Sequence, residues 1–221
     1  MVSKKPDGSI YCKLVYWGPS MGGKTTSVDK LYSLLAQQKS QITPISEFYK
    51  IAMASGSTLF FDRGVFQYSG SPVYFQVYTV AGQPRFRMAR KSVYSGADGI
   101  IFVADSDPTQ WKENVDSLDE LIYVTAEQGR KLIEEIPLVF MLNKRDLPNA
   151  IPKDSFIDLL KRYGLILPPQ HPLFAWSPTV YETIATQGVG VVRAFGDCAR
   201  RIVLYHVKGP GRAPEISEIG K

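Results

Sequence analysis

A glycine-rich segment near the N-terminus carries the residue types that bind phosphate. Gly18 to Thr25, Gly-Pro-Ser-Met-Gly-Gly-Lys-Thr, fits the phosphate-loop pattern G-x-x-x-x-G-K-[ST] in full. The glycines let the backbone curl so that successive N–H groups converge on a β-phosphate, at the positive end of a following helix. Lys24 adds a charge between the β- and γ-phosphates, Thr25 offers its hydroxyl to Mg²⁺, and Thr26 can reach the α-phosphate. The predicted nucleotide-binding residues here are Gly18, Ser20, Met21, Gly22, Gly23, Lys24, Thr25 and Thr26.

A second segment, Asn143-Lys144-Arg145-Asp146, has the chemistry to select a base. The Asp146 carboxylate can accept two hydrogen bonds from the guanine ring N–H and exocyclic amine, a donor pair that adenine lacks. Asn143 can reach the ring N7, and the stem of Lys144 can cover one face of the base. Alone, this tetrapeptide is equally compatible with a charged surface turn. Together with the phosphate loop upstream it predicts binding of GTP and GDP.

Periodicity predicts the elements that must position these two segments. Apolar, β-rich stretches indicate six strands, at 10–17, 58–67, 72–80, 99–104, 136–142 and 173–176. Helical spacing indicates helices from 24 onward, within 81–94, and over 110–130, 153–163 and 189–206, while 39–57 is predicted to be a long loop. Alternating strands and helices favour an α/β fold with a mostly parallel sheet, one antiparallel strand and helices on both faces.

The predicted topology brings the informative segments together. In such sheets, ligands bind at the carboxyl ends of the strands. The phosphate loop follows the first strand, and the Asn143 segment follows the fifth. We therefore expect one nucleotide site at this edge.

Composition narrows the class of protein. With 221 residues, 44% of them apolar and 21% charged, the chain suits one soluble domain. We expect a domain over 1–207, a flexible tail over 208–221 and a cytoplasmic location, with no signal peptide and no lipid anchor. Cys12 and Cys198 are expected to be buried and reduced. The net charge of +5 is compatible with transient membrane contact, but no basic stripe with aromatic residues indicates nucleic acid.

The chain resembles the Ras superfamily of small GTPases, and in detail the MglA-type polarity GTPases of bacteria and their prokaryotic relatives. The superfamily resemblance rests on the phosphate loop and on Asn143 to Asp146. The narrower one rests on Thr58-Leu59-Phe60-Phe61-Asp62, on Tyr78-Thr79-Val80-Ala81-Gly82-Gln83 and on the run from Asn143 to Pro152. It implies a P-loop GTPase fold.

The resemblance also implies roles for single residues. Thr58 matches the switch-one threonine that meets Mg²⁺ and the γ-phosphate, and Gly82 the switch-two glycine whose N–H senses that phosphate. Gln83 matches the glutamine that orients the attacking water. Ala185 lies in the last base-binding loop, where its N–H would face the guanine O6.

Two departures from the family pattern weaken the expected catalysis. Thr79 stands where most Ras-like proteins have an aspartate near Mg²⁺, and Asp62 is the substitute that the resemblance offers. Ser57 stands where the MglA group has a built-in arginine finger. Arg85 and Arg87 are candidates for a relocated arginine. The alternative interpretation is that both lie at the solvated start of a helix.

Three functions compete at this stage. The leading one is a slow GTP-hydrolysing switch, with a roadblock-type (MglB-like) regulator and effector proteins as partners and a role in cell polarity or motility by resemblance. The second is a scaffold that binds GTP without hydrolysing it. The third, a P-loop kinase for a small molecule, would need a lid with arginines, and residues 39–57 contain none.

Overall fold

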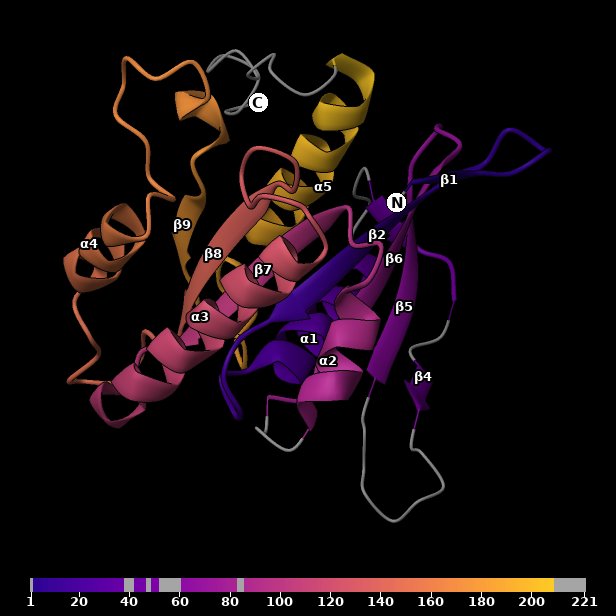
Figure 1. The fold of residues 1–221 in the computed structure, drawn as a ribbon. Coiled ribbons are helices and arrows are strands. Elements are labelled where there is room, and N and C mark those ends of the chain that lie inside the picture. Colours follow the sequence, from indigo (N-terminus) through magenta and orange to yellow (C-terminus); the bar gives the residue numbers. More distant parts are fainter. Residues whose placement is uncertain (1, 38–41, 47–48, 52–60, 83–85, 209–221) are drawn as a thin grey trace.

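The computed structural model describes residues 2–37, 42–46, 49–51, 61–82 and 86–208 (Figure 1). Thr58, Gln83 and Arg85 lie outside the described residues, as do the side chain of Asp62 and the predicted tail beyond Lys208. The helices are α1 (Lys24–Gln37), α2 (Arg87–Tyr94), α3 (Trp111–Glu127), α4 (Lys153–Arg162) and α5 (Val191–Lys208).

One mixed sheet runs through the molecule. Its strands are β1 (Ser3–Lys4), β2 (Ile10–Trp17), β3 (Ile42–Pro44), β4 (Tyr49–Ile51), β5 (Phe61–Tyr68), β6 (Val73–Thr79), β7 (Gly99–Asp105), β8 (Leu138–Asn143) and β9 (Thr179–Glu182). The order is β3-β5-β6-β2-β7-β8-β9, with β1 beside β2 and β4 beside β5. Neighbours from β6 to β9 pair in parallel, whereas β5 is antiparallel to β6. The α/β class and the mostly parallel sheet with the antiparallel strand β5 are confirmed, whereas β1, β3 and β4 are additional to the six predicted strands.

Two predictions about the strands were wrong. The predicted loop over 39–57 contains β3 and β4, both of which are held by antiparallel pairing to β5. The predicted strand at 173–176 is instead a 3₁₀ turn, Phe174–Trp176, and the last strand is β9. Arg201 of α5 donates to the carbonyls of Ala175 and Ser177, which keeps those groups from a strand partner.

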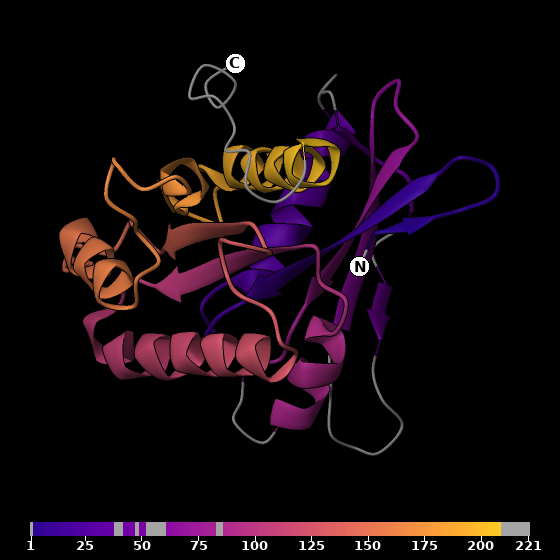
Figure 2. The same ribbon diagram turned by 45° about the horizontal axis from the view of Figure 1, so that its top comes forward.

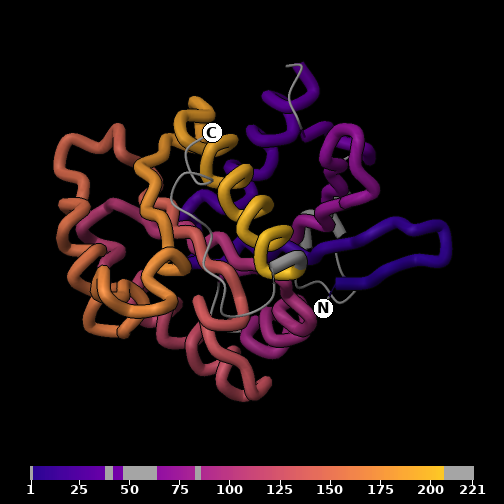
Figure 3. Tube along the Cα trace, turned by 90° about the horizontal axis from the view of Figure 1, so that it is seen from above, coloured from indigo at the N-terminus to yellow at the C-terminus, as the bar shows by residue number. Residues whose placement is uncertain are grey.

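Helices cover both faces of the sheet (Figure 2). On one face α1 and α5 pack over buried residues such as Leu14 and Val103; on the other, α2, α3 and α4 pack over residues such as Trp17 and Phe140. Seen from the α5 side, that helix crosses the sheet and the β1–β2 hairpin extends beyond it (Figure 3). Neighbouring residues of one buried strand thus serve opposite cores, as in parallel sheets covered on both sides.

Two smaller features concern the cysteines and the helices. Cys12 and Cys198 are buried free thiols, as predicted. In the part of the chain that the structure describes, none of the helices has the length and apolar character needed to cross a bilayer.

The buried aromatic stack between β7 and β8 generates a stability prediction. Phe140 is 1% exposed, and its ring centroid lies 4.6 Å from that of Phe102. Phe140→Ala should lower the free energy of unfolding by about 3–5 kcal/mol, because it removes apolar contacts and leaves a cavity. Met88→Ala, at a side chain that is 79% exposed, should change it by less than about 0.5 kcal/mol. Urea unfolding followed by circular dichroism measures both; similar losses in the two variants would contradict the assignment of this core.

Candidate nucleotide-binding site

The phosphate loop is shaped by close contacts that leave no room for side chains. Gly18 has φ +140°, and a Cβ there would lie 2.2 Å from the carbonyl oxygen of Val103 in β7. Gly23 has φ +102°, and its Cβ would lie 2.1 Å from Nδ2 of Asn143. Met21 also has a positive φ, of 58°, and its side chain is 85% exposed. The two glycines therefore fix the loop against β7 and against the base-binding segment.

Lys24 is folded back into this loop. Its ammonium donates to the carbonyl oxygens of Gly18 at 2.9 Å and Pro19 at 2.5 Å, and the residue is only 6% exposed. Burial, together with the smaller effect of the positive charge of Arg90, lowers the pKa of Lys24 to about 7. A bound phosphate would favour the charged form again, since opposite charge raises the pKa of an amine.

The side-chain oxygens near the phosphate loop suit a magnesium ion that binds together with its nucleotide. Thr25 lies in the first turn of α1, while Thr79 is buried at the end of β6. Across the described residues no group of three or more His, Cys, Asp or Glu side chains could hold a metal. Mg²⁺ keeps several waters and binds proteins through one or two oxygen ligands plus substrate phosphates. The hydroxyl of Thr25 fits that arrangement, and an all-protein cage does not.

Asn143 joins the phosphate loop to both base-binding segments. It is 3% exposed at the end of β8, and its Nδ2 donates to the carbonyl of Gly22 at 2.9 Å. Its Oδ1 accepts from the N–H of Ala185 at 2.9 Å and from the hydroxyl of Thr183 at 3.3 Å. Nδ2 keeps a second hydrogen, and its bond to a guanine N7 stays a prediction, as does the contact of the Ala185 N–H with O6.

Lys144 and Asp146 follow directly on this buried anchor. Lys144 has a left-handed φ of 63°, and its ammonium donates to Oδ2 of Asp105 at 2.5 Å. Asp105 is fully buried at the end of β7, where Asn114 bonds both its backbone N–H and its carbonyl. Asp146 is exposed in the adjoining turn. The strand end thus holds the lysine stem in place and leaves the Asp146 carboxylate accessible.

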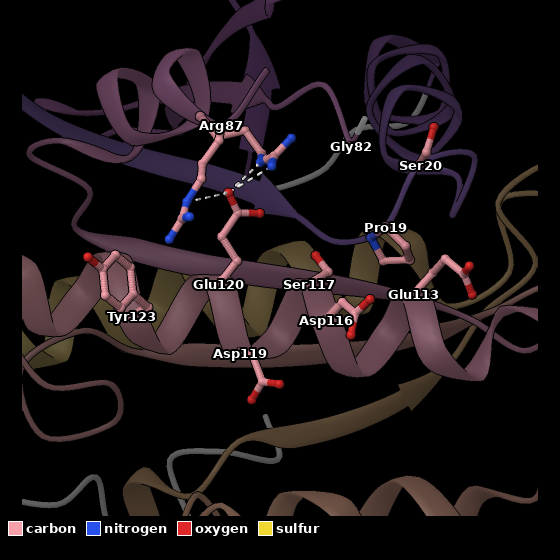
Figure 4. A pocket seen from close by; sticks show the side chains of 11 residues that line it. Pro19, Ser20, Gly82, Arg87, Glu113, Asp116, Ser117, Asp119, Glu120 and Tyr123 are labelled. Carbon is pink, nitrogen blue, oxygen red and sulfur yellow. Dashed lines mark hydrogen bonds and ion pairs between the residues drawn. The ribbon is translucent and has the colours of Figure 1, made fainter. Parts of the chain in front are cut away.

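Gly82, which follows β6, lies against the phosphate loop. A Cβ on Gly82 would lie 2.3 Å from the backbone nitrogen of Ser20. Beside this contact, a cavity of about 530 Å³ opens between the phosphate loop, α2 and α3, and several acidic side chains of α3 line it (Figure 4).

Arg87 faces α3 rather than the phosphate loop. Its guanidinium lies 4.9 Å from the centroid of the Tyr123 ring and 3.9 Å from Glu120 (Figure 4). A role for this arginine at the phosphates would require it to leave both of these partners.

The structure brings most of the predicted site residues together. The phosphate loop, Gly82, the Asn143 segment and Ala185 meet at the carboxyl ends of β2, β6, β8 and β9. Sequence reasoning missed Asp105, which pairs with Lys144, and Arg90, whose Nη1 donates to the carbonyl of Ala81 at 3.0 Å. An acidic residue directly after the apolar run 99–104 was a usable signal for the first; nothing local marked the second.

The close approach at Gly23 generates a prediction with a matched control. Gly23→Ala should weaken GDP binding by about a hundredfold, because the new methyl group would displace Asn143 and distort the loop. Gly70→Ala also places alanine at a positive φ (71°), but nothing lies within 4 Å of its Cβ, so it should only cost about 1 kcal/mol of stability. Titration with a fluorescent GDP analogue measures both. Equal GDP affinities in the two variants would show that the close approach of Gly23 to Asn143 is not required for binding.

Comparisons with known proteins agree with this geometry. The family model described as "ADP-ribosylation factor family" matches residues 4–199. The mutual gliding-motility protein MglA of Myxococcus xanthus is 32% identical over 203 residues, which cover 90% of this chain and 94% of that protein. ADP-ribosylation factor-like protein 6 of Caenorhabditis briggsae is 25% identical over 87% of each chain.

A solved structure shares the fold. The Arl6 BBS3 small GTPase from Trypanosoma brucei, with a bound nucleotide analogue GppNp, superposes with a TM-score of 0.60 at 19% identity, over 87% of this chain and 98% of that one. The chain thus belongs to the ADP-ribosylation factor family within the Ras superfamily of small GTPases, and it resembles MglA.

Proposed function

We propose that this protein is a guanine-nucleotide switch that binds GTP and GDP, hydrolyses GTP slowly and signals through the loops that meet the γ-phosphate. The observation that carries the proposal is the bridging position of Asn143, between the carbonyl of Gly22 in the phosphate loop and the N–H of Ala185. One buried side chain thereby fixes the distance between a phosphate-binding and a base-binding segment. A nucleotide, which has both groups, is the ligand that such a pairing suits.

The proposed chemistry is attack of water on the γ-phosphorus, with loss of GDP as the leaving group. Gln83 would orient the water, while the N–H of Gly82 and the hydroxyl of Thr58 would meet the γ-phosphate. Thr25 and Thr58 would bind Mg²⁺, with Asp62 near it, and the ion would neutralise charge on the β- and γ-oxygens. Because hydrolysis removes the γ-phosphate, it would release the segments that carry Thr58 and Gly82.

Slow turnover follows from the groups around the phosphates. Ser57 and Thr79 replace the arginine and the aspartate of the usual patterns, and Arg87 is engaged on α3. An arginine finger is worth about 10³ to 10⁵ in rate. The protein should therefore depend on an activating partner, or on Arg85, for the positive charge that an arginine finger supplies.

Partners and location come from the resemblance. We propose a roadblock-type (MglB-like) regulator, effector proteins that bind the switch loops, and a role in polarity or motility in the cytoplasm. The name of the MglA relative, a gliding-motility protein, supports this assignment. No nucleic acid partner is proposed.

A scaffold that binds GTP without turning it over is the second candidate. The buried Thr79 favours it, because this side chain supplies no carboxylate near the metal. Retention of Gln83 argues against it.

Guanine selectivity is tested by a change of one functional group. Asp146→Asn replaces two acceptors with an amide, so GTP affinity should fall by about a hundredfold while affinity for xanthosine triphosphate, which has a carbonyl in place of the exocyclic amine, should rise. Competition against a fluorescent GDP analogue measures both, and mass spectrometry of the purified wild-type protein identifies its natural nucleotide. Bound ADP, or unchanged GTP affinity in the variant, would contradict the assignment of guanine.

Hydrolysis is tested by single-turnover phosphate release over hours. The wild-type rate should be at or below about 10⁻³ s⁻¹, and Gln83→Leu should lower it at least about tenfold with GDP affinity unchanged. Arg87→Ala should leave the rate unaltered, and Arg85→Ala tests the remaining arginine. A Gln83→Leu rate equal to that of the wild type would favour the scaffold.

A further inference from the structure

Arg90 is a buried arginine of α2 that the proposed function does not use. It is 4% exposed, and among the described residues its guanidinium bonds Glu120 and the carbonyl of Ala81. Nε and Nη2 donate to Oε1 of Glu120 in α3, at 3.1 and 2.7 Å, while Nη1 donates to the carbonyl oxygen of Ala81 at 3.0 Å. Figure 4 shows Glu120 pointing from α3 toward α2, where these contacts meet. The rigid fork of a guanidinium is what allows one side chain to serve both acceptors.

The carbonyl that Arg90 holds belongs to the peptide group that carries the N–H of Gly82. No peptide bond of the described residues is cis, and in a trans peptide the C=O and N–H point to opposite sides. The contact at Ala81 therefore turns the Gly82 N–H away from the guanidinium. Gly82 itself lies against the phosphate loop, where a Cβ would come within 2.3 Å of the Ser20 nitrogen. The peptide is thus bonded by Arg90 at its carbonyl and is followed by a residue that lies close to the loop.

Other cations of α2 contact α3 without reaching this backbone. Lys91 forms an ion pair with Glu127 at 3.0 Å, with both side chains partly exposed (42% and 31%). Arg87 is 59% exposed and 3.9 Å from Glu120. Of these three cations Arg90 alone is buried and bound to Ala81, so its contribution differs in kind from a surface ion pair, which is worth little.

We propose that Arg90, held by Glu120, is a positioning residue that aims the Gly82 N–H at the terminal phosphate and so sets the preference of the site for nucleoside triphosphate over diphosphate. The inference rests on the proposed function, in which the Gly82 N–H meets the γ-phosphate. GDP lacks that phosphate, so a misaligned peptide weakens binding of the triphosphate alone. An arginine that only stabilised the fold would affect both nucleotides alike.

The test compares the Kd of a non-hydrolysable GTP analogue with the Kd of GDP, both measured in Mg²⁺ by displacement of a fluorescent GDP analogue. Arg90→Lys keeps the charge and the pairing with Glu120, but a single ammonium lacks the fork that reaches Ala81 as well. The ratio of the analogue Kd to the GDP Kd should rise about tenfold, as for loss of one hydrogen bond to the γ-phosphate, with GDP affinity changed less than about threefold. Glu120→Gln should raise the ratio in the same direction.

Lys91→Ala is the matched control, because it removes an α2–α3 ion pair that does not touch Ala81; its ratio should equal that of the wild type. If Arg90→Lys does not fold, the double variant Arg90→Met with Glu120→Met takes its place. It removes both charges together, so no buried charge is left without its partner. It should show the same rise in the ratio.

The two proposals fail in different samples. An unchanged ratio in Arg90→Lys, an equal loss for both nucleotides, or a rise in Lys91→Ala as large as in Arg90→Lys would overturn the role of Arg90. A wild-type protein that binds no guanine nucleotide would overturn the proposed function itself, and the inference with it. Where the wild type binds both nucleotides and Arg90→Lys raises the ratio as expected, both stand.

Discussion

The amide of Asn143 is the contact on which the arrangement of the site depends. Its nitrogen bonds the carbonyl of Gly22, and its oxygen accepts from Ala185 and Thr183, all within a region closed to solvent. A buried polar group that loses its partner costs about 1–3 kcal/mol, because no water replaces it. Any shift of the phosphate loop relative to the base-binding loops would break at least one of these bonds. The two segments therefore behave as one unit.

Glycines make this unit possible by letting backbones approach each other. Gly18 meets the Val103 carbonyl of β7, Gly23 meets Asn143, and Gly82 meets Ser20. At each of these positions a methyl group would come within 2.3 Å of another atom. The parallel sheet supplies the rest, since it delivers the ends of β2, β6, β7 and β8 to one edge. On the proposed function, the phosphates would thus be positioned by backbones that approach each other at glycines, at one edge of the sheet.

Sequence alone predicted the parts of this frame that have local signals. The bounds of β2 and the start of α1 follow from an apolar run that stops at a glycine turn. The short strands β3 and β4 have no such signal, because they exist only through pairing with β5. The last strand was misplaced because the apolar residues at 173–176 resemble a strand, whereas Arg201, distant in sequence, takes the carbonyls of Ala175 and Ser177. Arg90 was missed because its described acceptors, the Ala81 carbonyl and Glu120 of α3, lie outside its own helix.

The contacts of Asn143 and those of Arg90 bear differently on how such a site could signal. A ligand shifts a conformational equilibrium only by its differential affinity for the two states. GTP and GDP share the base, the sugar and two phosphates, so on the proposed function the base-binding groups that Asn143 fixes would contact features common to both and would not distinguish them. Discrimination must come from groups that meet the γ-phosphate, and on the proposed function Lys24 and Gly82 are such groups among the described residues. The carbonyl that precedes Gly82 is bonded by Arg90, and Arg90 is bonded to Glu120 of α3. On the role proposed for Arg90, helix α3 would be a route by which a partner bound away from the phosphates could change the preference for GTP.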